Sequence, residues 1–240
     1  MHFIDLTFPR IADNLALEEA LLDEAECGRW QSEVLRFWNA NSVFVVLGRS
    51  SRYQDEIRVS VVEQRNIPVF RRISGGMSVV CAPGCMFYCV LLSLKFRPHL
   101  RMLDSAHQFV IDQLRHAVQI ATDSKIKMDG TCDLVVGGKK FSGNSLRIGR
   151  DWLIYHGTLL LEMDLNLVED LLKHPPREPT YREGRKHTDF LTNLSASSSS
   201  LKQALIETWS ASPTDERLPY DRISQLVEEK YSRREWNLQR

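Results

Sequence analysis

The sequence lacks an excess of charge of either sign. Its 240 residues include 31 basic and 31 acidic side chains, so the formal net charge is zero. A protein that binds nucleic acid or an anionic membrane surface through its overall charge carries a basic excess, and this chain has none. We therefore expect no nucleic-acid partner and no membrane partner, and any recognition by charge must come from local clusters.

Long apolar runs are also absent from the sequence. The longest, near residues 86–92, is far shorter than the roughly 20 apolar residues that cross a bilayer. The first ten residues, MHFIDLTFPR, lack the basic segment, apolar core and small-residue cleavage site of a signal peptide. With 43% hydrophobic and 26% charged residues, the composition is that of a soluble globular protein, and we expect a cytoplasmic location.

Cysteine is scarce, and its five positions follow no metal-binding spacing. Cys27, Cys81, Cys85, Cys89 and Cys132 are odd in number, so free thiols are expected in the cytoplasm rather than disulfides. Three of them repeat every four residues, but no paired Cys-x-x-Cys spacing or well-placed histidine completes a tetrahedral site. We expect buried thiols there, with no metal site and no tightly bound cofactor.

The sequence does contain a succession of short strands and amphipathic helices. Apolar residues recur at helical spacing over residues 14–25, where Asp13 or Asn14 could cap the helix, and over residues 102–120, where the helix is expected to cover a sheet. Short β-branched and aromatic runs predict strands at residues 34–38, 43–47, 69–72, 77–81, 87–92, 133–136, 139–142 and 152–161. Because tight turns join some strands and helices join others, we predict an α+β domain with a mixed, largely antiparallel sheet covered by helices.

The C-terminal part of the chain alternates loops with helices. A proline-rich, basic stretch over residues 173–187 and the serine run at 195–200 interrupt regular structure. The serine run is expected to cap a helix over residues 201–209, and a last helix is expected over 223–236.

A glycine pair follows two arginines between two predicted strands, in the segment Arg71-Arg72-Ile73-Ser74-Gly75-Gly76. Paired glycines let backbone amides approach an anion closely, and guanidinium groups suit a carboxylate or a phosphate. From residue types alone, a hairpin turn with two solvated arginines is the commoner interpretation.

A lysine pair, Lys139 and Lys140, starts another predicted strand. If Lys139 faces solvent, alternation along the strand turns Lys140 the other way, together with Ser142. Lys140 is then either a half-buried snorkelling side chain or a cation held for an anionic group. His156 opens an apolar strand, where a single histidine is more often a hydrogen-bonded core residue than a catalyst.

Taken in order, these segments resemble the lipoate-protein ligase and octanoyltransferase family, part of the superfamily that includes biotin-protein ligase. That family has an Arg-Arg-x-x-Gly-Gly turn, an Asp-Leu strand, a Gly-(Arg or Lys)-Lys-x-x-Gly element and a His-Gly-Thr-Leu strand. Residues 71–76, 133–134, 138–143 and 156–159 match these elements. The likeness runs from about residue 14 to about residue 164, and it implies a fold like that of class II aminoacyl-tRNA synthetases and biotin ligases.

Carried over residue by residue, the resemblance implies that Lys140 is the catalytic residue. It would bond the carboxyl and phosphate oxygens of an acyl-adenylate, or the carbonyl of an acyl thioester. A fixed cation and backbone donors stabilise the negative charge that builds on oxygen, by about 3 kcal/mol per well-placed donor. The resemblance assigns the substrate-binding positions to Arg72, Ser74, Gly75, Gly76, Asp133, Ser142, Gly143, Asn144, His156 and Gly157.

The resemblance also implies a reaction. A lipoate-protein ligase-like enzyme would attach a lipoyl or octanoyl group to one lysine of a lipoyl-carrier domain, through an acyl-adenylate made from ATP and Mg²⁺ as substrates. One alternative is ATP-independent octanoyl or lipoyl transfer from an acyl-carrier-protein thioester, and another is a non-catalytic acyl-binding partner subunit. The choice among lipoate, octanoate and biotin depends on the width of the acyl site.

Three departures from the family pattern bear on these alternatives. Met77 replaces the third glycine of the turn, which narrows backbone approach there. Residues 1–194 are expected to form the catalytic domain and 195–240 a helical extension, too short for a full accessory domain, so adenylation could require a separate accessory subunit. The transferases use a cysteine. Leu153 occupies one family position for it, and Cys132, eight positions before Lys140, is either a nucleophile or a small buried residue.

The basic stretch over residues 173–187 resembles a segment of bacterial family members. It could order over the active site or receive an acidic lipoyl-domain surface, where basic charge speeds encounter. It could equally be a solvated loop.

Overall fold

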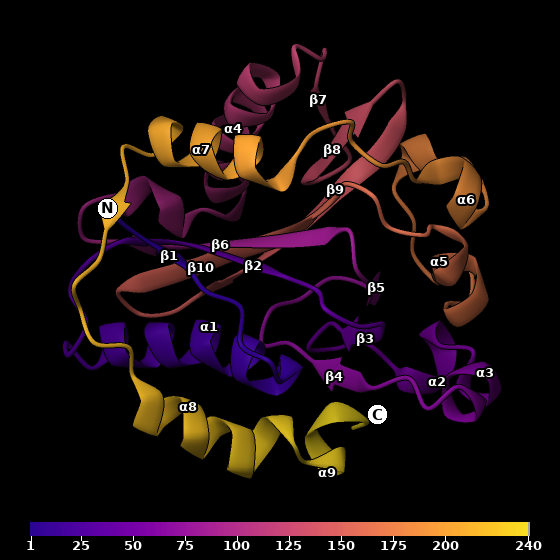
Figure 1. The fold of residues 1–240 in the computed structure, drawn as a ribbon, viewed down its shortest axis with the longest axis horizontal. Coiled ribbons are helices and arrows are strands. Elements are labelled where there is room, and N and C mark those ends of the chain that lie inside the picture. The colour runs from indigo at the N-terminus through magenta and orange to yellow at the C-terminus, as the bar shows by residue number, and fades with distance from the viewer. Residues whose placement is uncertain (240) are drawn as a thin grey trace.

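The computed structural model describes residues 1–239, which form two β-sheets and the helices around them (Figure 1). The strands are β1 (His2–Asp5), β2 (Val34–Asn39), β3 (Phe44–Leu47), β4 (Val69–Arg71), β5 (Val79–Cys81), β6 (Cys85–Ser93), β7 (Lys127–Asp129), β8 (Asp133–Val136), β9 (Lys139–Ile148), β10 (Trp152–Leu160) and β11 (Ser212–Pro213). The α-helices are α1 (Ile11–Glu26), α2 (Tyr53–Glu56), α3 (Val59–Gln64), α4 (Leu103–Thr122), α5 (Asn166–Leu171), α6 (His187–Phe190), α7 (Ser198–Thr208), α8 (Tyr220–Leu226) and α9 (Arg234–Asn237).

The larger sheet has the order β11-β1-β2-β6-β10-β9-β8-β7, and the smaller has the order β4-β3-β5. In the larger sheet β1 pairs in parallel with β2 and β11, and the other neighbouring strands pair antiparallel. In the smaller sheet β3 is parallel to β4 and antiparallel to β5. The predicted α+β class with a mixed, largely antiparallel sheet is confirmed.

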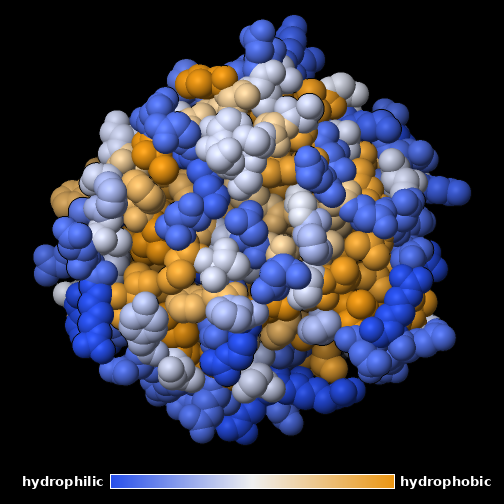
Figure 2. Space-filling model, in the orientation of Figure 1, coloured by the Kyte–Doolittle hydropathy of each residue, from blue (hydrophilic) through white to orange (hydrophobic). Residues whose placement is uncertain are grey.

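Two apolar cores lie on opposite faces of the larger sheet. In Figure 1, α4 and α7 lie on one side of this sheet, and α1 and α8 lie on the other. Strand β6 supplies both cores, because Phe87, Cys89 and Leu91 point toward α1 while Val90 and Leu92 point toward α4. A strand buried on both faces has a continuous apolar sequence, which is why the longest apolar run of the chain is this central strand. Hydrophilic residues surround the rim of the face seen in Figure 2, and apolar residues are visible between hydrophilic ones nearer its middle.

Of the two helix caps predicted from the sequence, the one for α1 is wrong and the one for α7 is confirmed. Helix α1 begins at Ile11, so Asp13 and Asn14 lie inside its first turn and do not cap it. Asn14 instead hydrogen-bonds both backbone groups of Phe8, at 2.9 and 3.0 Å, and so fixes the chain that enters the helix. The serine cap is confirmed at the other end of the molecule, because the Ser197 side chain accepts a hydrogen bond from the backbone of α7.

Residues 195–239 pack against the rest of the chain on both faces of the sheet. Helix α7 lies against α4, β11 extends the sheet beside β1, and α8 runs along α1. The last helix predicted from the sequence is two short helices, α8 and α9, separated by a π-helical turn at Val227–Tyr231. The division of the chain at residue 194 stays a prediction.

Two further observations complete the fold. Within residues 1–239 no helix is long and apolar enough to cross a membrane. All five cysteines are free thiols, as expected.

Candidate active site

A cavity of about 410 Å³ opens between the two sheets, and a smaller one of about 140 Å³ lies beside it. The larger cavity is lined by α1, by the turn after β4, by β3 and β5 of the smaller sheet, by the facing parts of β2, β6, β8, β9 and β10, and by residues 177–179. The smaller one is lined by β5, β9 and the loop over residues 173–187. Both cavities share one wall, which contains Met77, Lys140, Gly143, Thr158 and Arg177. Residues from four separate sequence motifs therefore meet at one place, whereas Ser74 and Gly75 are not among the described residues that line either cavity.

Lys140 lies where the two cavities meet. As the strand alternation predicted, Lys139 is exposed, whereas Lys140 is partly buried and points with Ser142 toward the interior. The Lys140 side chain is 25% exposed, and its Nζ lies 2.8 Å from Oδ1 of Asp133 on the neighbouring strand β8. The pairing of β8 and β9 shifts register at Leu134 and Val135. This cation is thus held by one carboxylate at the boundary of two cavities, where an anionic group of a ligand could replace that carboxylate.

The glycine turn is not a hairpin. Strands β4 and β5 on either side of it each pair with β3 and not with each other, so the turn crosses over the end of β3. The two arginines are not solvated either: Arg71 is fully buried, and the guanidinium of Arg72 donates to Ser74 Oγ at 3.1 Å and to the carbonyls of Gly75 and Met77. The hairpin interpretation is wrong because β3, which lies far from the turn in sequence, separates the two strands.

Burial lowers the pKa of Arg72 to about 10, so its guanidinium stays charged at neutral pH while it holds the turn from inside. Gly76 has a φ of +83°, a conformation that favours glycine. Met77, at the position of the missing third glycine, lines both cavities.

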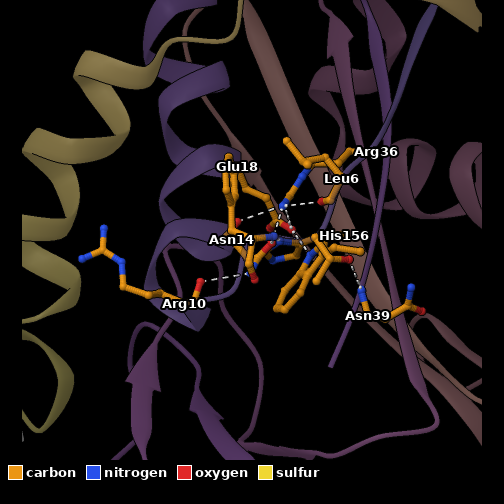
Figure 3. A network of polar contacts seen from close by, with 10 residues as sticks. Leu6, Arg10, Asn14, Glu18, Arg36, Asn39 and His156 are labelled. Atoms are coloured by element: carbon orange, nitrogen blue, oxygen red, sulfur yellow. Dashed lines mark hydrogen bonds and ion pairs between the residues drawn. The ribbon is translucent and has the colours of Figure 1, made fainter. Parts of the chain in front are cut away.

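A buried network at the far end of the larger cavity joins helix α1 to β2 and β10 (Figure 3). Glu18 accepts hydrogen bonds from Trp38 Nε1 at 3.0 Å and from Arg36 Nη1 at 3.3 Å, and Nδ1 of His156 bonds its second oxygen. Burial raises the pKa of Glu18, but the charge and hydrogen bond of His156 and the charge of Arg36 outweigh burial, and the pKa lies below its ordinary value. Glu18 is therefore an ionised carboxylate inside the core.

His156 also contacts Ser74, whose Oγ lies 2.5 Å from Nε2. Serine, histidine and a carboxylate in this order resemble a nucleophile with its base. However, Ser74 is 1% exposed, it is not part of either cavity wall within residues 1–239, and its Oγ also accepts from Arg72. The arrangement therefore positions His156 and the glycine turn relative to each other and does not present a nucleophile.

Asn144 ties the strand of Lys140 to the loop before Asp133. Its Nδ2 donates to the Cys132 carbonyl at 2.6 Å and to Ser142 Oγ at 3.2 Å, and its Oδ1 accepts from Tyr88 at 2.6 Å. Gly157 is packed against this side chain, since a Cβ at Gly157 would lie 1.9 Å from Asn144 Oδ1. The Asn144 and Gly157 positions are thus parts of one tightly packed wall of the cavity.

The Cys132 thiol lines the larger cavity and donates to the Asn144 carbonyl, with Sγ and O 3.1 Å apart. Burial, with the nearby charge of Asp133, raises the pKa of Cys132 to about 11. A nucleophilic cysteine needs the opposite shift, because the thiolate is the reactive form.

The basic loop over residues 173–187 lies against the site. The Tyr181 hydroxyl donates to Asp133 Oδ2 at 2.8 Å, so one carboxylate holds both this loop and Lys140. Arg185 donates to the Gly138 carbonyl at 3.1 Å, and Arg177 lines both cavities. The loop is not merely solvated. Its position matches the alternative in which it orders over the site.

Sequence reasoning missed Glu18, Arg36, Trp38 and Tyr181 as residues of the site. A signal for Glu18 was present, because it follows Leu15 by three residues on the apolar face of α1, where an acid is out of place. Within residues 1–239, no group of three or more His, Cys, Asp or Glu side chains could hold a metal ion.

Comparison with known proteins identifies the family. Residues 10–209 match the lipoyl protein ligase A/B catalytic domain. This chain belongs to that family. Its match to the "Probable lipoate-protein ligase A" of Mycoplasma pneumoniae is 32% identical over 63% of the chain and 42% of the relative, so the chain spans less than half of that protein. Its match to the octanoyltransferase LipM of Geobacillus kaustophilus is 24% identical over 99% of the chain and 98% of the relative.

Comparison with solved structures shows that this chain has the fold of lipoate-protein ligases. A bi-partite lipoate protein ligase from Thermoplasma acidophilum, studied with its E2 lipoyl domain, superimposes with a TM-score of 0.82 at 19% identity, covering 100% of this chain and 97% of that one. A lipoate-protein ligase A bound with ATP gives a TM-score of 0.79 at 20% identity, covering 99% and 98%. At these identities the comparison establishes the lipoate-ligase fold and nothing finer.

Proposed function

We propose that this protein attaches a lipoyl-type acyl group to a lysine of a lipoyl-carrier domain, through an acyl-adenylate. The observation that carries the proposal is the position of Lys140 at the junction of two cavities, the larger with an apolar inner part and the smaller with basic side chains on its wall. An acyl-adenylate has three parts that correspond to the two cavities and to Lys140 between them: an apolar acyl chain, a nucleotide, and an oxygen-rich acyl-phosphate group that joins these two.

The larger cavity suits the acyl chain. Away from Lys140 it is lined by Leu15, Trp38, Val46 and Phe87, and it ends at the Glu18 network. A narrow apolar site of this kind removes a fatty or lipoyl chain from water and so binds it through the hydrophobic effect. We propose lipoate or octanoate as the acyl group.

The basic side chains of the smaller cavity suit the phosphates of the nucleotide. Lys173, Arg177 and Arg182 line it together with Lys140, and Glu56 is the acidic side chain on the same wall. Cationic side chains favour phosphate oxygens. The ATP-bound relative of the same fold supports ATP as the activating substrate, and Mg²⁺ would enter with it.

The chemistry follows from this arrangement. In the first step a carboxylate oxygen of the acyl substrate attacks the α-phosphorus of ATP, and pyrophosphate leaves. In the second, the neutral amine of the acceptor lysine attacks the acyl carbon, the bond to the phosphate oxygen breaks, AMP leaves and the amine loses a proton. Lys140, released from Asp133, would stabilise the oxygen charge that develops in both steps, and the closed site would hold the reacting groups in line.

Transfer to a purified lipoyl domain, measured by intact mass, tests the proposal. One sample contains free lipoate, ATP and Mg²⁺, and a second contains octanoyl-carrier protein without ATP. We expect modification in the first sample. Modification in neither would contradict an acyl-transfer function of this chain acting alone.

A second candidate, ATP-independent transfer from an acyl-carrier-protein thioester, is favoured by the match to LipM along nearly the whole chain. It requires a thiol nucleophile, and Cys132 lines the cavity. The raised pKa of Cys132 favours the ligase. Modification in the second sample only, with a hydroxylamine-sensitive adduct on the enzyme, would establish the transferase instead.

A separate accessory subunit is the remaining question, since the ligase from Thermoplasma acidophilum is bi-partite. In this alternative the chain carries out only the transfer step, and a second subunit is required for adenylation. Supplying preformed lipoyl-adenylate tests this. Transfer from the adenylate but not from lipoate and ATP indicates a missing subunit, whereas binding of lipoate without transfer from either indicates a non-catalytic acyl-binding subunit.

A further inference from the structure

Residues 227–239 lie behind the two elements that carry cavity residues, α1 and the turn after β4. We call these residues the C-terminal brace. Toward α1, Lys230 Nζ lies 2.7 and 2.8 Å from the two carboxylate oxygens of Glu19, and the Tyr231 hydroxyl donates to the same group at 2.7 Å. Glu19 directly follows Glu18, the buried acid of the larger cavity. The brace therefore grips α1 at the residue next to the site.

The brace holds the strand before the glycine turn even more closely, through Arg71. Trp236 Nε1 donates to the Arg71 carbonyl at 3.0 Å, Asn237 Oδ1 accepts from the Arg71 amide at 3.1 Å, and the Arg71 guanidinium donates to the carbonyls of Trp236 and Gln239 at 3.1 and 2.6 Å. Lys230 also lies over the Trp236 ring, 4.0 Å from its centre. Contacts to both the backbone and the side chain of one residue fix its position in all directions.

Arg71 passes this constraint to the glycine turn. Its Nη1 donates to the carbonyls of Gly48 and Ser51, at 2.7 and 2.8 Å. The loop over residues 48–51 in turn bonds the glycine turn, because the Arg49 amide donates to the Ser74 carbonyl at 2.8 Å and Ser51 Oγ donates to the Gly76 carbonyl at 3.3 Å. A continuous set of hydrogen bonds thus runs from the brace through a fully buried guanidinium to the wall of the cavity.

The two adjacent pairs, Glu18 with Glu19 and Arg71 with Arg72, show the same division of roles. In each pair one residue lines the larger cavity and its neighbour is bound by the brace. Adjacent side chains on a strand point to opposite sides, and on a helix they diverge by about 100°. Binding the outer member of each pair therefore sets the position of the inner one without occupying the cavity.

We infer that the C-terminal brace positions the acyl-binding wall, and that Arg71 is a positioning residue which acts through the loop over residues 48–51 and the glycine turn. Its effect on catalysis rests on the proposed acyl transfer, whereas its effect on the glycine turn does not.

Backbone amide hydrogen exchange of the protein without ligand is the primary test. The variants are Arg71→Met, which removes the connection, and Trp236→Phe, which removes one donor from the brace and keeps an aromatic ring. Arg222→Ala is the matched control, because Arg222 binds Asp23 at 2.6 Å and so attaches α8 to α1 away from the brace contacts. We expect the Arg49 and Arg72 amides to exchange about tenfold faster in Arg71→Met and severalfold faster in Trp236→Phe, and to be unchanged in the control.

Steady-state transfer to a lipoyl domain supplies the second readout. If the brace positions the wall, kcat falls about tenfold in Arg71→Met while KM for the lipoyl domain is unchanged, because only the acceptor lysine of that domain enters the cavity. Faster exchange confined to residues 220–239, with the Arg49 and Arg72 amides unchanged in both variants, would overturn the inference. If Arg71→Met does not fold, Trp236→Phe decides the question. If wild-type protein transfers nothing, the proposed function fails, but the exchange result still decides whether the brace sets the turn.

Discussion

Replacement of Glu18 by glutamine tests whether the buried network is electrostatic or merely well packed. Glutamine has the same shape and keeps an acceptor for Trp38, but it removes the negative charge next to the fully buried guanidinium of Arg36. Breaking a buried ion pair by removing one partner typically costs 3–5 kcal/mol. Asn14 continues to accept two hydrogen bonds from Arg36, so we expect the lower end, about 3 kcal/mol of unfolding free energy.

Urea unfolding at pH 7 measures this loss directly, and for a chain of this size it corresponds to a fall in Tm of roughly 10 °C. The pH dependence has a definite sign. Since the pKa of Glu18 is lowered from 4.5 in the folded state, its stabilisation is complete above about pH 4.5 and is lost as the pH falls through the lower, folded value. The difference in unfolding free energy between wild type and Glu18→Gln should therefore shrink as the pH falls below about 4.5.

Two controls make the result specific. Glu24 on the same helix pairs with Arg29, which is 63% exposed, and Glu24→Gln should cost less than about 1 kcal/mol. Adding Arg36→Met to Glu18→Gln removes the unpaired cation and should recover part of the lost stability. A cost below about 1 kcal/mol for Glu18→Gln, independent of pH, would refute the assignment of Glu18 as a buried carboxylate that balances Arg36.

Three further predictions concern the walls of the cavity. Gly157→Ala places a Cβ against Asn144 Oδ1 and should cost about 2 kcal/mol in urea unfolding, with loss of transfer activity. Tyr181→Phe removes the hydrogen bond to Asp133 and should speed amide exchange in its own loop about fivefold, with the rest of the protein unchanged. Because the pKa of Cys132 is raised to about 11, its alkylation by iodoacetamide should be slow at pH 7.5 and rise about tenfold per pH unit up to that value, as measured by site-resolved mass spectrometry.

Each of these three predictions has a control within the same protein. A Cβ at Gly75 meets no atom within 4 Å, so Gly75→Ala should unfold like wild type, and an equal loss in both glycine variants would contradict the packing argument. Uniformly faster exchange in Tyr181→Phe would indicate general destabilisation of the protein and not the loss of one local hydrogen bond. Cys27 is exposed and should react first; alkylation of Cys132 at a comparable rate at pH 7.5 would show that its thiolate is accessible after all.

The sequence predicted those features that depend on local pattern. Alternation along one strand correctly separated Lys139 from Lys140, and helical spacing correctly placed a helix over most of α4. The order of the motifs led to the correct family, since a short list of residue types in a fixed order is more specific than any one of them.

Features that depend on long-range contacts were not predictable in this way. The glycine turn reads as a hairpin until β3 is found between its two flanking strands. Glu18 and His156 are 138 residues apart, and Arg71 meets Trp236 at a separation of 165 residues. No periodicity links such pairs, because their contact is decided by how whole elements pack. The cap prediction for α1 failed for a local reason, because Asn14 bonds the chain that enters the helix and not the first turn.

Lys140 is proposed to stabilise the reacting acyl-phosphate, and the adjacent lysine offers the sharpest comparison. Lys139 precedes it on the same strand but faces solvent. Lys140→Ala and Lys139→Ala should be compared by intact mass for lipoyl transfer from preformed lipoyl-adenylate to a purified lipoyl domain. We predict that Lys140→Ala loses at least about a hundredfold in transfer rate, the amount expected for a lost charge-stabilising donor, and that Lys139→Ala transfers like wild type. Transfer at the wild-type rate by Lys140→Ala would contradict it.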